Sequence, residues 1–123
     1  MSFANSLYYK PLVDILIDEY FNNQSNFTEE KIRDIYSRTY YTIFLYCRDT
    51  LEIENNDYIS SHKNVILSIP NKYTKKVLRR LQQLRVDADY KNDAFSKNYR
   101  EVIAIQRDMN KILSFSKKQL ETL

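Results

Sequence analysis

The residues best suited to chemistry lie at the end of a basic segment in the second half of the chain. Arg85 follows Leu81 by four residues, so in a helix it flanks the apolar side instead of opposing it. Asp89 comes four residues later and is followed by Tyr90. A partly buried guanidinium needs a carboxylate, a phosphate or an aromatic ring beside it. Two interpretations stay open: Arg85 pairs internally with Asp87 or Asp89, or it binds a phosphate group.

Positive charge gathers in the segment that leads to Arg85. Residues 72–85 contain no acid, and their other cations are Lys72, Lys75, Lys76, Arg79 and Arg80. The chain up to Asp57 carries five basic and ten acidic side chains, and the remainder carries fourteen basic and six acidic ones. Such a surface is a solvated helix face, a contact for nucleic-acid phosphates, or a partner for the acidic half of a second copy.

Other kinds of chemistry find little support in the composition. The 123 residues include no glycine, which excludes the phosphate loops and dinucleotide turns that require it. One His and one Cys do not make a metal site, so we expect no metal and no cofactor. Cys47 lies in the most apolar stretch and is predicted to be a buried structural thiol. His62 is predicted to be a capping or surface residue near a helix start, or else a second group for the Arg85 site.

The hydrophobic periodicity predicts an all-α fold: a single domain over residues 1–123, built as a compact bundle of four to five helices. Asparagine replaces glycine in the tight turns, and residues 87–93 form a connection. We expect helices at about 11–21 with Pro11 in the first turn, after Asn26 to about 51, from Ser60 or Ser61 to the stop at Pro70, at about 71–86, and from Ser96 onward.

Two of these helices have predicted buried faces. The stretch 39–47 is apolar on nearly every side, so its helix should be central and covered by neighbours all round. No uncharged stretch approaches the roughly 20 residues of a membrane span, and no secretion signal is evident, so we expect a cytoplasmic protein. The inward stripe of the last helix is predicted to be Tyr99, Val102, Ile103, Met109 and Leu113.

Three blocks of the sequence occur in a characteristic order: SRTYYTIFLYCRDTL at 37–51, SSHKNVI at 60–66 and LRRLQQLRVDADY at 78–90. Together they resemble the HEPN superfamily of small helical bundles. Each block is short, but their order and spacing agree with a family branch that carries Ser-Arg-x-Tyr-Tyr, His-x-x-Val-Ile and Arg-x-x-Ala-Asp-Tyr. The resemblance covers about residues 31–120.

The resemblance implies a homodimer that binds RNA or a nucleotide in a groove at its two-fold axis. Many HEPN proteins are metal-independent ribonucleases of toxin–antitoxin or phage-defence systems, and some act beside a nucleotidyltransferase-type partner protein. Their motif is an Arg followed after four to six residues by a His, which stabilise phosphate charge and move protons respectively. Arg85 aligns with the motif Arg, whereas Asp89 and Tyr90 occupy the place of the motif His. His62 would then have to approach from a neighbouring helix.

Two alternatives to this site remain open. Arg38, with Tyr41 nearby in the central helix, is placed to pair with Asp87 or Asp89 across the bundle, which would make the cluster structural. The second alternative is that the chain is a non-catalytic interaction module, which dimerises or docks a partner protein through its tyrosines. Tyrosine is enriched at protein contacts. The tyrosines considered for that surface are Tyr8, Tyr9, Tyr20 and Tyr58.

Overall fold

The computed structural model describes the backbone of residues 3–23, 29–53, 61–90 and 98–123. It also describes the side chains of these residues, except those of residues 3–9, 29, 61–64, 86–90 and 98–99. The predicted all-α bundle is confirmed, since the described residues form helices and contain no strand. None of these helices is long and apolar enough to cross a membrane. The helices are α1 (Phe3–Asn22), α2 (Glu29–Thr50), α3 (Ser61–Ser68), α4 (Lys72–Tyr90), α5 (Asn98–Leu113) and α6 (Lys117–Glu121).

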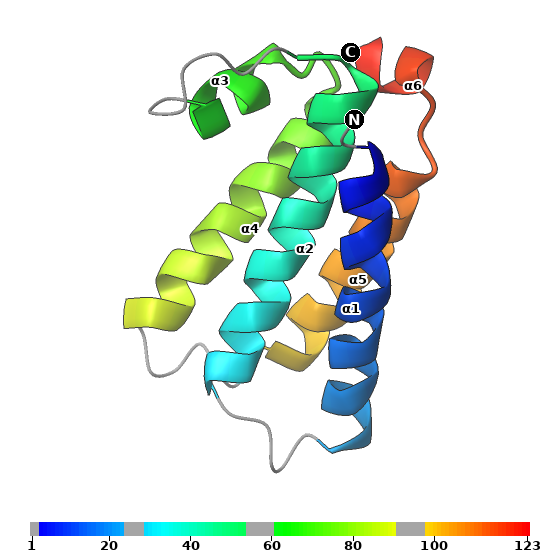
Figure 1. Ribbon diagram of the computed structural model, residues 1–123. Coiled ribbons are helices and arrows are strands. Elements are labelled where there is room, and N and C mark those ends of the chain that lie inside the picture. Colours follow the sequence, from blue (N-terminus) through cyan, green and yellow to red (C-terminus); the bar gives the residue numbers. More distant parts are fainter. Residues whose placement is uncertain (1–2, 24–28, 54–60, 91–97) are drawn as a thin grey trace.

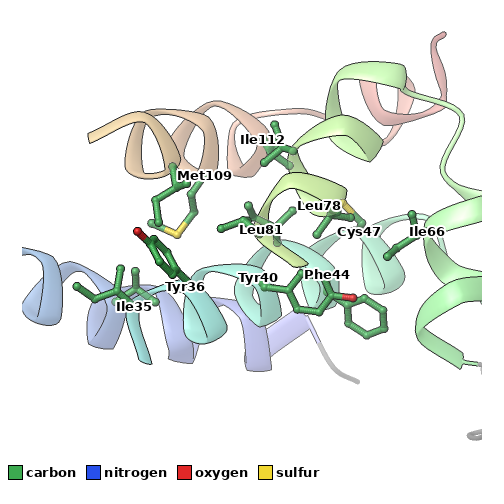
Figure 2. Packing of buried hydrophobic residues seen from close by; sticks show 14 of the residues in the cluster. Ile35, Tyr36, Tyr40, Phe44, Cys47, Ile66, Leu78, Leu81, Met109 and Ile112 are labelled. Atoms are coloured by element: carbon green, nitrogen blue, oxygen red, sulfur yellow. The ribbon is translucent and has the colours of Figure 1, made fainter. Parts of the chain in front are cut away.

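The second helix, α2, is the centre of the bundle. It packs against α1, α4 and α5, while α3 lies beside its end (Figure 1). Figure 2 shows side chains of three helices meeting in the core, among them Tyr40 of α2, Leu81 of α4 and Met109 of α5. The prediction that α2 is covered all round is wrong at one position, because Tyr41 is 40% exposed. Three neighbours enclose α2, and the side that carries Tyr41 stays open.

The buried side of α5 differs from the predicted stripe. Val102 and Met109 are buried as expected, but Ile103 is 41% exposed. Ile105 and Ile112 take its place, which gives inward positions at steps of three and four residues. A residue next to Val102 is turned by about 100° around the helix axis, and this rotation carries Ile103 to the solvent side.

Two helix boundaries and one short helix also differ from the prediction. Pro11 lies in the interior of α1, where its ring suits helical φ although the position donates no backbone hydrogen bond. The fourth helix continues through residues 87–90, where the sequence predicts a connection. The sequence pattern does not indicate the sixth helix, α6. Its five residues are too few for a periodic pattern, and a capping box at Ser116 and Gln119 defines its start.

Asn71 joins the start of α4 to the C-terminal segment. Its side-chain oxygen accepts hydrogen bonds from the backbone N–H and the hydroxyl of Thr74, which caps α4. Its side-chain N–H₂ group donates to the carbonyls of Gln119 and Thr122, at 3.2 and 3.0 Å. With Leu120 fully buried, this one side chain satisfies polar groups at the ends of two helices and fastens the C-terminus to the bundle.

The end of α2 shows how this chain turns without glycine. Ile53 N–H bonds to the carbonyl of Arg48, and Glu52 N–H bonds to that of Asp49, a Schellman arrangement. Glu52 occupies the left-handed position with φ of 56°, where glycine is the usual residue. Among the described residues it has the only positive φ, so the prediction that asparagine makes the tight turns is wrong there.

Replacing Glu52 with glycine should therefore stabilise the protein. We expect Glu52→Gly to raise the free energy of unfolding by about 1 kcal/mol, because glycine adopts this φ without a Cβ clash. Glu52→Ala is the matched control: it keeps the Cβ atom and loses only the exposed contact with Lys117 at 3.5 Å, so a change below about 0.5 kcal/mol is expected. Urea unfolding followed by circular dichroism measures both, and equal effects of the two variants would contradict the argument.

Candidate functional site

Arg85 lies against an aromatic ring at the seam between α4 and α2. Its guanidinium carbon is 5.5 Å from the centre of the Tyr40 ring, and Arg85 is half-buried. One turn earlier, Gln82 donates a hydrogen bond to the Tyr40 hydroxyl at 3.3 Å. Of the three kinds of support expected for a partly buried guanidinium, the described contacts show the aromatic one.

Tyr40 belongs to a cluster of three rings on α2. It stacks on Phe44 at 5.9 Å between ring centres, and Tyr41 meets both rings edge-on at 5.7 and 6.4 Å. Tyr40 and Phe44 are buried, while Tyr41 extends to the surface. Stacked and edge-on contacts are the favoured geometries of aromatic pairs, so the cluster holds its rings in defined orientations.

The Tyr40 hydroxyl is held neutral by its surroundings. Burial raises the pKa of Tyr40 to about 12, against the opposing effects of the nearby Arg85 charge and the hydrogen bond from Gln82. Tyr40 therefore offers Arg85 the face of a neutral ring and no negative charge.

The predicted basic face of α4 lies on the outside of the bundle. Lys72, Lys76 and Arg79 are exposed, at helix steps of four and three residues that place them on one side. Lys75 is half-buried beside them. Arg80 forms an ion pair with Glu101 of α5, which balances part of its charge and sets it apart from this face.

A second polar cluster, between α4 and α5, was missed by the sequence reasoning. The Tyr73 hydroxyl donates to Asp108 at 2.5 Å, the Lys111 ammonium lies 4.5 Å from the centre of the Tyr73 ring, and Phe115 meets that ring edge-on. Tyr46 of α2 donates from its hydroxyl to the carbonyl of Phe115 at 2.6 Å. These contacts join residues far apart in sequence, and no local pattern indicates them.

The remaining predicted site residues are only partly placed. Arg38 is half-buried on α2, but the side chains of Asp87, Asp89 and Tyr90 lie outside the described part, although their backbone forms the last turn of α4. The side chain of His62 is likewise outside it. Its helix α3 lies beside the first turns of α4, whereas Arg85 is about 20 Å further along that helix (Figure 1). The fold thus brings Arg85 to Tyr40 and separates it from α3.

Other expectations from the sequence can be compared with the described residues. Cys47 is fully buried as predicted, and burial raises the pKa of its thiol to about 12. Tyr20, considered for a docking surface, is only 5% exposed, so it does not contribute to one; the side chains of Tyr8, Tyr9 and Tyr58 lie outside the described part. Among the described residues no three His, Cys, Asp or Glu side chains gather where they could hold a metal.

Comparisons of the chain with protein-family models, with curated proteins and with solved structures find no match. The resemblance to HEPN proteins therefore rests on the three sequence blocks alone.

Two tyrosines and one cysteine with raised pKa values predict how the stability of the fold depends on pH. Burial raises the pKa of Tyr73 to about 12, and the hydrogen bond to Asp108 and the negative charge of Asp108 act in the same direction. Burial raises the pKa values of Tyr40 and Cys47 to about 12 as well. The folded state keeps protons that the unfolded chain loses from Cys near pH 9.0 and from Tyr near pH 10.0. The free energy of unfolding should thus be unaffected by these groups below about pH 9 and fall steadily up to about pH 12.

Urea unfolding across this pH range, with tyrosinate absorbance recorded in parallel, tests the expectation. Tyr73→Phe removes one of these groups and should make the decline above pH 10 shallower. Ionisation of every tyrosine near pH 10 in a protein that is still folded would contradict it.

Proposed function

We propose that this protein binds RNA through the outer face of α4, and that it does so as a HEPN-type homodimer. The observation that supports the proposal best is the concentration of positive charge on α4. Three exposed cations follow the outer face of the helix, and Arg85, on the side of the helix that faces α2, lies half-buried over Tyr40. No acid interrupts α4 before residue 87.

The spacing of these cations suits a polyanion. Lys72 and Arg79 are seven residues apart, which corresponds to a rise of about 10 Å along the helix, and Lys76 lies between them. Successive phosphates of a strand can follow such a row. Contacts of this kind supply affinity without reading the sequence, and they release counterions when they form.

Arg85 is suited to a more specific contact. A guanidinium that lies over a ring still has N–H groups that can bind two phosphate oxygens at once. Contact with the buried Tyr40 ring restricts the group, so less side-chain entropy is lost on binding than for a freely moving lysine. Arg85 is therefore the residue that orients a phosphate, and the exposed cations on the outer face of α4 attract the rest of the polyanion.

The dimer and the biological setting come from the HEPN resemblance. A two-fold axis near α4 would double the cations that face one RNA strand. The same resemblance suggests a toxin–antitoxin or phage-defence role, beside a nucleotidyltransferase-type partner. Asp89 and Tyr90 stand where the family's motif His is found, so proton transfer would need a group other than a histidine on this helix.

Removing charge from the α4 face should weaken RNA binding in a salt-dependent way. We expect Lys76→Gln/Arg79→Gln to lower the slope of log affinity against log salt by about 1.4 for single-stranded RNA, because two phosphate contacts are lost. Lys10→Gln/Lys31→Gln is the matched control, since it removes the same charge from α1 and from the start of α2. Fluorescence anisotropy with a labelled RNA over a salt series measures both, and equal effects of the two pairs would place binding elsewhere.

Cleavage is tested separately by incubating RNA with the protein in the presence of EDTA. We expect metal-independent cleavage that falls by about 100-fold or more in Arg85→Ala, because an interaction with the phosphate charge in the transition state is removed. Arg107→Ala, which removes an exposed cation of α5, should leave the rate unchanged. RNA that stays intact with the unaltered protein, while binding persists, would restrict the function to binding.

A further inference from the structure

We infer that Tyr41 is a stacking platform for an unpaired base of single-stranded RNA. This inference rests on the proposed RNA-binding function and specifies the form of RNA that the site binds. Sequence reasoning assigned Tyr41 to a structural group with Arg38. The structure gives it a different setting, because it is the exposed member of the ring cluster that supports Arg85.

Tyr41 stands out from its surroundings on α2. It is 40% exposed, whereas its neighbours Tyr40, Thr42 and Ile43 are fully buried. The open side of α2 between α1 and α4 therefore displays an aromatic side chain within an otherwise buried stretch. Burial of a base against it would remove further apolar surface from water, which favours stacking.

The ring is also held in place before any ligand arrives. Tyr41 meets the edges or faces of Tyr40 and Phe44 at interplanar angles of 79° and 81°. Those two rings are buried and stacked on each other, so the contact surface beneath Tyr41 is rigid. A side chain that is already oriented loses little conformational entropy when a base stacks on it.

Two arginines lie on the turns of α2 and α4 near this ring. Arg85 is on the α4 side, over the Tyr40 ring that Tyr41 touches. Arg38 precedes Tyr41 by three residues on α2 and thus lies on the same side of that helix, half-buried. A nucleotide whose base stacks on Tyr41 would have its phosphates within the field of two guanidinium groups.

This combination fits single-stranded RNA better than a duplex. Paired bases are stacked on each other and offer no free face, and the edges of an A-form helix are reached through its shallow groove. Single strands are bound by a cationic track together with aromatic rings on which bases stack, and this recognition tolerates many sequences. We therefore expect little base preference and a strong preference for unpaired RNA.

The test uses a short single-stranded RNA that contains 2-aminopurine, whose fluorescence is quenched by stacking. The chain has no tryptophan, so its own emission does not mask that of the probe. We expect quenching by the unaltered protein. Tyr41→Leu should abolish the quenching and weaken binding by roughly 5-fold to 100-fold, the effect of removing one base–aromatic stack. Tyr41→Phe is the matched control: it keeps the ring and should change affinity by less than about twofold.

Several outcomes would overturn the inference. One is binding of Tyr41→Leu as tight as that of the unaltered protein, with the quenching intact. Another is equal weakening by Leu and Phe, which would assign the effect to the hydroxyl. A third is a shift in sedimentation of Tyr41→Leu without a change in RNA affinity, which would make Tyr41 a contact between copies of the chain. In each case Lys76→Gln/Arg79→Gln reports independently on the α4 face, so failure of the platform is distinguishable from failure of RNA binding.

Discussion

The structure depends on the burial of α2. This helix carries bulky apolar side chains on most of its circumference, and a bundle is stable only if other helices remove them from water. The packing of α1, α4 and α5 against it satisfies that requirement. The two threonines in the buried middle of α2 fit the same requirement, because Thr39 and Thr42 donate their hydroxyls to carbonyls one turn earlier. No polar group of these two side chains then needs water.

Burial of α2 also decides which way α4 faces. Leu78 and Leu81 must point toward α2 and the core, so the cations on the other side of α4 are forced outward. Arg85 lies at the border between the two sides and reaches Tyr40 there. The burial of α2 thus accounts both for the exposed charge of α4 and for the contact between Arg85 and the Tyr40 ring.

Much of the fold could be predicted because it depends on local periodicity. The existence of five helices, the central place of α2 and the burial of Cys47 all come from the order of apolar and polar residues. The exact registers were harder to obtain. Ile103 and Ile105 are equally apolar, and only the position of neighbouring helices decides which one is buried. The short α6 depends on Asn71, which lies about fifty residues earlier in the chain.

The candidate site divides in the same way. Sequence alone placed a row of cations on one helical face and put Arg85 beside the apolar side, because a helix repeats every 3.6 residues whatever surrounds it. It could not reveal that Tyr40 supports Arg85, that Glu101 pairs with Arg80, or that Tyr41 is left uncovered. These are contacts between helices, and they arise only when tertiary packing sets the distance and rotation of one helix relative to another.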